Sequence, residues 1–466
     1  MFHLLGTLVL TKFLINGTLV LRMDYIHRDL HDNLIKPLND YLLGGPPKGF
    51  IVTGIVGCGK STLIEQVLTE LKNKSEINVF SFNGDDSVFR QRILEDSKYV
   101  YDLVSSKTSD KAIIFVDEIQ KCEEVFDSLK IAFDKGKYSF IVSGSNPAFL
   151  STVAKKRLQR RADQLMLLPI SLKELFQHQS TKHASTSNIH EKKTTFHFEK
   201  ILFEYKNYSD IDSLKLTLND EFEKTIHSYF LTGGLPLTIQ SKSLNEKLTE
   251  IRLTVERGFE LMSVENNAVA EFTRAEMAKL SGQEFAYKNI LEKTRLRKRD
   301  AINTVIDDLI NHGYLVKRKP ILLGSNKTSY LSIFSFIDPG IVTYLTGDLE
   351  FEKRIGSALE GYVHARLFNL IYNYPLKGDL HYYKPFIIEN DERIRYIQGE
   401  VDFVFTVGNR IIPLEVKYNF RSASIDTSII NAFIQKHNCP YGVVLYGGVP
   451  KIIKESKLIF WPFWLV

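Results

Sequence analysis

The sequence predicts an α/β protein of several domains that begins with a parallel sheet, and two stretches support this prediction. In the first, an apolar run from Phe50 ends in a glycine-rich loop, and apolar residues after Thr62 recur at helical spacing. In the second, an apolar run at residues 112–116 leads directly into Asp117 and Glu118. Buried strands followed by polar residues are typical of parallel sheets, which bind ligands at that edge.

The loop at residues 54–61 fits a phosphate cradle. Its glycines let successive backbone N–H groups turn toward anionic oxygens at the N-terminus of the next helix. Lys60 is expected to reach the terminal phosphates, and Ser61 to hold Mg²⁺. An ordinary glycine turn is the alternative, but strand, loop and helix occur in the required order. The residues expected to bind nucleotide here are Gly54, Gly57, Gly59, Lys60, Ser61 and Thr62.

The acidic pair after the second strand has the chemistry that ATP hydrolysis requires. Asp117 is expected to hold Mg²⁺, and Glu118 to orient and polarise the attacking water. Asn146, which follows an apolar run at residues 138–142, is expected to sense the γ-phosphate. A helix cap and a plain turn are the alternatives, because these residue types are common at both. The predicted cofactors are therefore ATP and Mg²⁺.

Basic residues follow Asn146 on an expected helix. One of Arg157, Arg160 and Arg161 could act as an arginine finger in a neighbouring subunit, which would require a homo-oligomer. A solvated basic face is the alternative.

Composition indicates a globular protein of a reducing compartment. The three cysteines, Cys58, Cys122 and Cys439, are odd in number and far apart, so they form no disulfide framework. This favours a cytoplasmic location. A net charge of +5 is small for 466 residues, so any affinity for nucleic acid must depend on where the charge lies.

The first 22 residues differ from the rest of the chain. They are apolar but interrupted by Lys12, Asn16 and two glycines. They therefore fall short of the roughly 20 apolar residues that a bilayer span needs, and no membrane partner is expected. They also lack a clear cleavage site of a signal peptide. Because Met23 opens a more ordinary sequence, we expect translation to begin there and residues 1–22 to be an extension created by an upstream start codon.

Further domains are expected after the nucleotide-binding core at residues 23–176. Residues 177–199 are polar and predict a disordered or inserted loop, and residues 200–264 predict a helical lid. Residues 265–346 show the order of helices and strands of a winged helix, with basic residues crowded at its third helix and wing. This distribution suits DNA phosphates, although an internal connector with a solvated basic face explains it equally. The basic residues are Arg295, Arg297, Lys298, Arg299, Lys317, Arg318 and Lys319.

The last domain, residues 350–466, carries a second set of acidic residues. Asp402 lies in one expected strand, and Glu415 and Lys417 share a face of the next. Such a set suits metal-assisted phosphodiester hydrolysis, with Asp402 and Glu415 binding Mg²⁺ and Lys417 orienting water. Glu360, on the preceding amphipathic helix, would be an outer ligand. An exposed Glu-Lys pair on an edge strand is the alternative.

Several segments, in this order, resemble one protein family: Gly54–Thr62, Val116–Gln120, Ser143–Ser145, Leu168–Ser171, Tyr229–Pro236, Phe336–Gly340, Leu359–Gly361 and Val401–Lys417. The family is that of archaeal and bacterial AAA-like ATPases whose C-terminal region of unknown function resembles a PD-(D/E)XK nuclease. The resemblance covers about residues 23–466. Asn146 departs from it, because the family usually has a small hydroxyl residue there.

The resemblance implies a P-loop NTPase sheet with a helical lid, a winged helix and a restriction-endonuclease-like α/β domain. It implies that Lys60, Ser61, Asp117 and Glu118 act in ATP hydrolysis. By the same resemblance, Asp402, Glu415 and Lys417 match the nuclease pattern. The expected function is thus an ATPase coupled to action on DNA through the winged helix and the last domain. The alternative is an ATP-dependent signalling or scaffold switch whose last domain is a non-catalytic interaction module.

Overall fold

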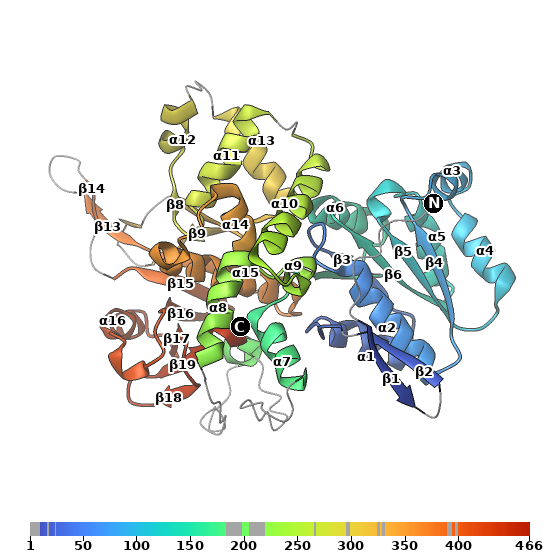
Figure 1. Ribbon diagram of the computed structural model, residues 1–466, viewed down its shortest axis with the longest axis horizontal. Helices are drawn as coiled ribbons and strands as arrows, with labels where there is room; N and C mark the ends of the chain where they lie inside the picture. Colours follow the sequence, from blue (N-terminus) through green and yellow to red (C-terminus); the bar gives the residue numbers. More distant parts are fainter. Residues whose placement is uncertain are drawn as a thin grey trace.

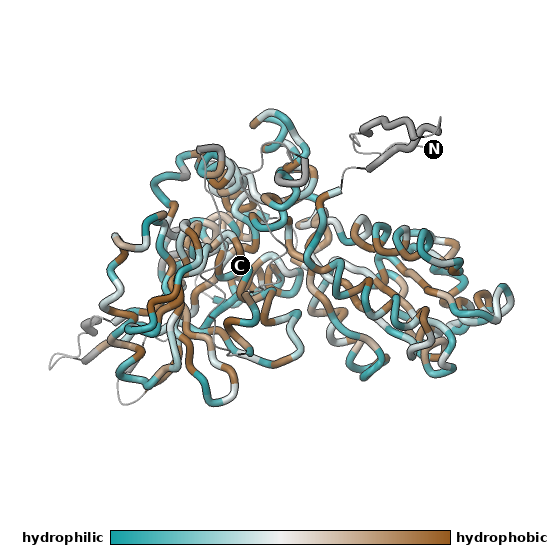
Figure 2. The backbone as a smooth tube through the Cα atoms, turned by 90° about the horizontal axis from the view of Figure 1, so that it is seen from below, coloured by the Kyte–Doolittle hydropathy of each residue, from teal (hydrophilic) through white to brown (hydrophobic). Residues whose placement is uncertain are grey.

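The computed structural model places two sheets at opposite ends of the molecule, with a group of helices between them (Figure 1). Segments of hydrophobic residues run through the interior at both ends of the molecule (Figure 2). None of the described helices has the length and apolar character that crossing a membrane requires. The described residues are 10–15, 18–23, 25–182, 198–204, 220–264, 267–294, 299–323, 327–328, 331–388, 394–396 and 399–466.

The first sheet has five parallel strands in the order β4-β5-β6-β3-β7. Strand β3 lies between β6 and β7, so the loop after β3 opens at a switch in strand order, where α/β sheets bind ligands. The strands are β3 Gly49–Thr53, β4 Asn78–Asn83, β5 Ala112–Asp117, β6 Tyr138–Gly144 and β7 Asp163–Met166.

Helices cover both faces of this sheet because the strands are apolar on both sides. One face packs against α1 and α2, and the other against α3 to α6. Asp86 caps helix α3, because its side chain accepts hydrogen bonds from the N–H groups of Val88 and Phe89. The helices are α1 His31–Leu42, α2 Lys60–Lys74, α3 Ser87–Glu95, α4 Tyr99–Lys107, α5 Val125–Asp134 and α6 Pro147–Arg157.

The prediction of a loop at residues 177–199 is wrong for residues 177–182. Helix α7, Leu172–Lys182, continues through the first six of these residues, because its apolar residues Leu175 and Phe176 pack on the last domain. Residues 183–197 lie outside the described part of the chain. The π-helix Lys200–Glu204 also buries its apolar residues in the core of the last domain.

The helices expected to form a lid lie between the two sheets (Figure 1). Helix α10 begins with a capping box formed by Ser243 and Glu246. Helix α8 ends before Gly233, which has a positive φ of 74°. The helices are α8 Asp220–Thr232, α9 Pro236–Gln240 and α10 Leu244–Glu260.

The order of elements of a winged helix is present after the lid. Three helices are followed by antiparallel strands, and a short strand after the first helix pairs with the last strand. The sequence pattern anticipated the helices and the last two strands. The elements are α11 Ala268–Lys279, β8 Glu284–Phe285, α12 Tyr287–Thr294, α13 Asp300–Asn311, β9 Leu315–Pro320 and β11 Ser332–Phe336, followed by α14 Pro339–Thr346.

The strands of the winged helix and of the last domain form one sheet. Strand β9 pairs in parallel with β12, with Lys319 opposite His381, which gives nine strands in the order β18-β19-β17-β16-β15-β12-β9-β11-β8. The new strands are β12 Asp379–Tyr383, β15 Val401–Val407, β16 Arg410–Val416, β17 Gly442–Tyr446, β18 Lys451–Ile453 and β19 Leu458–Pro462. The two regions are therefore joined by backbone hydrogen bonds.

Helix α15, Ile355–Asn373, lies near the centre of the molecule, between the two sheets (Figure 1). Helix α16, Ser428–Lys436, packs on β16 and β17. The remaining strands form two small sheets: the hairpin of β1 Leu10–Ile15 and β2 Thr18–Met23, and the sheet of β10 Lys327–Thr328, β13 Pro385–Ile388 and β14 Ile394–Tyr396.

Candidate nucleotide site and its connection to the last domain

The loop between β3 and α2 presents positive charge at one place. Gly57 and Gly59 have positive φ values of 74° and 96°, which let the backbone turn tightly before the helix starts at Lys60. The Lys60 ammonium lies over the loop and donates to the carbonyls of Gly54 and Ile55, at 3.0 Å each. A lysine, a glycine loop and a helix N-terminus together suit an anion.

The predicted metal-binding residues lie side by side. The hydroxyl of Ser61 donates to Asp117 Oδ2 at 2.8 Å. The other carboxylate oxygen of Asp117 accepts from the hydroxyl of Ser143 and from the backbone N–H of Glu118. Oxygen ligands of this kind fit Mg²⁺, and the contact connects the P-loop helix to the end of β5.

Glu118 is held in an uncommon conformation beside this carboxylate. Its φ of 49° is in the left-handed region, which non-glycine residues rarely adopt and which functional sites often contain. The amide of Gln120 donates to Glu118 Oε2 and, at 3.0 Å, to Ser145 Oγ. Gln120 thus orients Glu118, a role that the sequence analysis missed although the residue lies in the same motif.

Asn146 connects the nucleotide domain to the end of α13. Its side chain caps α6 by accepting from the N–H of Phe149 at 3.0 Å. Its amide nitrogen also lies 3.2 Å from Nε2 of His312, just after α13. His312 is buried, and its other ring nitrogen is 3.2 Å from Asp308 Oδ1. The role of His312 could not be predicted from local sequence, because the contact joins distant segments.

The three candidate arginine fingers are not equivalent. Arg157 pairs with Asp127 at 3.2 Å, and Arg161 pairs with both oxygens of Asp134. Arg160 is exposed and pairs with no acidic residue within the described part of the chain. Of the three, Arg160 is therefore the one without an ion pair among the described residues.

The lid helices lie directly on the phosphate loop. A Cβ atom on Gly57 would be 2.6 Å from the methyl group of Thr254 in α10, and one on Gly59 would be 3.4 Å from Pro236 in α9. Only glycine allows this approach at Gly57. The described lid therefore contacts the loop that is expected to bind the phosphates.

A comparison of two glycine substitutions tests this contact. Gly57 and Gly136 have similar φ values, 74° and 72°, but nothing lies within 4 Å of a Cβ on Gly136. Both alanine variants should lose about 1–2 kcal/mol of stability from left-handed strain. Only Gly57→Ala should also displace α10 and weaken ATP binding, which calorimetric titration measures. Equal ATP affinity in the two variants would contradict the packing argument.

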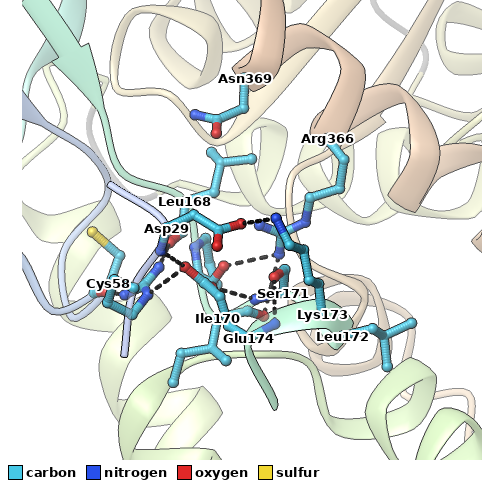
Figure 3. Close-up of polar contacts among 12 residues, drawn as sticks. Asp29, Cys58, Leu168, Ile170, Ser171, Leu172, Lys173, Glu174, Arg366 and Asn369 are labelled. Carbon is cyan, nitrogen blue, oxygen red and sulfur yellow. Dashed lines mark hydrogen bonds and ion pairs between the residues drawn. The ribbon is translucent and has the colours of Figure 1, made fainter. Parts of the chain in front are cut away.

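A buried ion network lies beside the phosphate loop (Figure 3). Arg28, which is 5% exposed, donates to the backbone carbonyl of Cys58 in the loop at 3.0 Å and to Glu174 Oε1 at 3.1 Å. Glu174 also accepts from the backbone N–H groups of Asp29 and Ser171, both at 2.8 Å. A loop carbonyl is thereby connected through one arginine to the start of α7.

Helix α15 also contacts the backbone just before α7. We call residues 166–171 the strap. Arg366 donates to the strap carbonyls of Pro169 and Ile170 at 2.8 and 3.2 Å, while Asn369 and Asn373 donate to Met166 O at 2.8 and 2.9 Å. Arg28 donates to the carbonyl of the strap residue Leu168. The strap thus joins the phosphate loop to α15.

Charge keeps Glu174 ionised in this network. Burial acts to raise its pKa, but the charges of Arg28 and Arg366 outweigh burial and hold the pKa below its ordinary value. No role for Arg28, Glu174 or Arg366 was predicted from the sequence. Glu174 lies just after the Leu168–Ser171 motif, which was the available signal.

The second acidic set also comes together. Asp402 in β15 accepts from the N–H of Val416 at 2.8 Å. Glu415 in β16 is only 6% exposed, and its Oε2 lies 2.9 Å from the Lys417 ammonium. Strand β16 lies between β15 and β17, so the alternative of an exposed pair on an edge strand is wrong. Within the described residues, Glu415 Oε1 is buried without a hydrogen-bond partner.

The pKa values of the two glutamates in this set are raised. Burial and the nearby Asp402 raise the pKa of Glu360 to about 7 and that of Glu415 to about 8. Lys417 opposes the shift at Glu415. Strongly shifted carboxyl groups in one cluster are typical of functional sites, although structural ion pairs also produce them.

The predicted basic wing is wrong at Arg318. This side chain is 2% exposed, because β9 lies inside the nine-stranded sheet and not at its edge. Its guanidinium lies 4.0 Å from the ring centroid of Phe403 and 3.6 Å from Glu360 Oε2. Arg318 therefore faces the second acidic set and is not available to DNA phosphates.

The exposed face of α13 is not basic either. It presents Asp300, Thr304 and Asp307. Arg299 before the helix lies over the ring of Tyr287, at 5.1 Å from the centroid. Arg295, Arg297 and Lys298 lie outside the described residues. The described part of this face offers few contacts for phosphate.

The sheet order, the phosphate loop and the acidic strand end define a P-loop nucleotide-binding fold. Comparison with protein families agrees with this. A family described as "AAA domain" matches residues 47–176, and one described as "Domain of unknown function (DUF4143)" matches residues 355–465. The chain thus combines an AAA-type P-loop domain with a C-terminal domain of unknown function. No curated protein matches the sequence.

Solved structures that match this chain include the ORC1 protein of Aeropyrum pernix in complex with DNA, at 14% identity, covering 71% of this chain and 94% of that one, with a TM-score of 0.28. Cdc6p of Pyrobaculum aerophilum has 12% identity, covers 69% and 96%, and has a TM-score of 0.28. AMPPCP-bound DnaA of Aquifex aeolicus has 15% identity, covers 60% and 85%, and has a TM-score of 0.26. We infer nothing further about this chain from TM-scores of this size.

Proposed function

We propose that this protein binds and hydrolyses ATP with Mg²⁺ and passes its nucleotide state to the C-terminal domain. The observation that carries the proposal is the 2.8 Å contact between Ser61 and Asp117. This contact joins the N-terminus of the helix after the glycine loop to the acidic end of β5. A nucleoside triphosphate and its metal ion need both groups at one site.

Each residue of the site then has a defined role. The loop N–H groups and Lys60 would bind the phosphates, and Ser61 and Asp117 would hold Mg²⁺. The metal ion would neutralise charge that develops on the phosphate oxygens. Glu118, oriented by Gln120, would hold the attacking water, and Asn146 would contact the terminal phosphate.

Two paths connect this site with the rest of the chain. One runs from Asn146 to His312 in the winged helix. The other runs from the Cys58 carbonyl through Arg28 to the strap and then to Arg366 on α15, the helix that also carries Glu360. A movement of the phosphate loop would therefore shift the position of α15 and of Glu360 in the second acidic set, because the connecting groups are buried and hydrogen-bonded.

The C-terminal domain, in this proposal, acts on DNA as a metal-dependent nuclease. The buried Glu415 Oε1 without a partner fits a metal ligand, and Asp402 and Glu360 supply further carboxylates. Lys417 would orient water and stabilise charge. DNA would bind through the winged helix, including the basic residues before α13.

One observation favours the alternative of a non-catalytic switch. The Arg318 guanidinium is buried against the acidic set and pairs with Glu360, so it supplies positive charge that a metal ion would otherwise provide. In this alternative, ATP occupancy controls the binding of a partner, and the nuclease-like domain serves for interaction.

Two assays on the purified chain distinguish the nuclease from the non-catalytic switch. They measure phosphate release from ATP and cleavage of DNA with Mg²⁺ or Mn²⁺. We expect Glu415→Gln to abolish DNA cleavage while leaving ATP turnover within about twofold of the wild type, because its carboxylate lies in the other sheet. Glu455→Gln, an exposed site in the same domain, is the control. ATP turnover without any DNA cleavage would remove the nuclease and support the switch.

A further inference from the structure

Two histidines and an aspartate meet at the start of α1, away from both acidic sites. His27, His31 and Asp32 each offer one ligand atom, and these atoms lie within 4.8 Å of one another. The chain makes one turn here, because the N–H of His31 donates to Arg28 O at 2.9 Å, which brings His27 beside His31. Their ring centroids are 5.0 Å apart.

The orientation of His31 is the main evidence for a site. Its side chain is 8% exposed, and Nδ1 is buried without a hydrogen-bond partner within the described residues. Nδ1 lies 3.9 Å from Asp32 Oδ1, while the other nitrogen, Nε2, lies 3.2 Å from Glu70 Oε2 on α2. A carboxylate at one ring nitrogen fixes the proton there and leaves the lone pair of the other nitrogen free for a metal ion.

The remaining ligands are accessible. His27 and Asp32 are exposed, so an ion can enter from solvent. Asp32 pairs with Lys36 at 2.7 Å, but an exposed i,i+4 pair is weak and yields to a metal ion. Within the described ranges, no other three His, Cys, Asp or Glu residues have ligand atoms this close together.

We propose that His27, His31 and Asp32 bind a divalent transition-metal ion, with Glu70 as the carboxylate that orients His31. Two imidazoles and one carboxylate suit Zn²⁺, and also Co²⁺ or Ni²⁺, rather than Mg²⁺ or Ca²⁺, which prefer oxygen ligands alone. Three protein ligands leave a position for water. The site is distinct from the predicted Mg²⁺ sites at Asp117 and at Asp402.

A metal ion at this place would affect the structure around the phosphate loop. His27 and Asp32 flank Arg28, which holds the Cys58 carbonyl of the phosphate loop. Glu70 belongs to α2, the helix that starts at Lys60. A bound ion would therefore fix the segment at residues 27–32 against the P-loop helix.

The test uses the full chain after removal of metal with a chelator. Titration with Zn²⁺ should show a site that the cluster variants weaken, and Co²⁺ should give the visible absorption of a nitrogen- and oxygen-bound ion. His27→Gln and Asp32→Asn are the main variants, because both residues are exposed and the fold should tolerate the change. Each should weaken Zn²⁺ binding at least about tenfold, and Glu70→Gln about 10–100-fold.

His227→Gln is the matched control, since His227 is a partly exposed histidine outside the cluster, 2.8 Å from Tyr418. It should bind Zn²⁺ like the wild type. Zn²⁺ should also raise the unfolding temperature of the wild type and the control but not of His27→Gln. No Zn²⁺ uptake by the wild type, or equal uptake by all variants, would overturn the proposal.

Discussion

Replacing Lys60 with alanine is expected to reduce ATP turnover by about 100-fold to 1,000-fold, the usual loss when one preorganised group that stabilises developing charge is removed. The ammonium is buried at the phosphate loop and reaches the carbonyls of Gly54 and Ile55. Its removal should also weaken ATP binding, because the positive charge acts on the bound phosphates as well as on the transition state. Phosphate release and calorimetric titration measure the two effects.

Two further variants make this result specific. Lys72→Ala removes an exposed lysine from the same helix and should leave turnover unchanged. Glu118→Gln should retain ATP binding while turnover falls, because Glu118 is assigned to the attacking water and not to the phosphates. If Lys60→Ala turned over ATP at the wild-type rate, the nucleotide site proposed at this loop would be wrong.

Replacing Glu174 with alanine is expected to cost about 3–5 kcal/mol of stability, because it leaves the buried charge of Arg28 without its partner. Arg28 also holds the Cys58 carbonyl, so nucleotide affinity should fall with stability. Denaturant unfolding and ATP titration measure these effects. Glu76→Ala, an exposed carboxylate in the same domain, should change stability by at most about 0.5 kcal/mol.

The pH dependence of unfolding provides an independent check on Glu174. Its folded pKa lies below the ordinary value of 4.5. The ionised group therefore contributes stability that is complete above the unfolded pKa and is lost as pH falls through the lower folded pKa. Glu174→Gln should remove this acid-dependent loss. An unchanged profile in that variant would show that the network contributes no such stability.

Local chemistry made the nucleotide domain predictable. A strand, a glycine loop and a helix must follow one another to form a phosphate cradle, so spacing alone located Lys60 and Ser61. A fully apolar strand followed by acids likewise located Asp117 and Glu118. The structure then brought Ser61 and Asp117 into contact, because parallel strands place their carboxyl ends at one edge.

The connections between domains could not be predicted in the same way. The pairing of β9 with β12 turned an expected surface wing into an interior strand and buried Arg318. The network of Arg28, Glu174 and Arg366 joins residues that are far apart in the chain.

The sequence by itself therefore determined the nucleotide loop, the acidic strand end and the kinds of element that follow. Only the tertiary structure decided which charged side chains are buried, which strands share a sheet and which histidine reaches Asn146. The physical reason is that periodicity and motif spacing describe each segment's own backbone and faces, whereas burial and ion pairing depend on which distant segment packs against it.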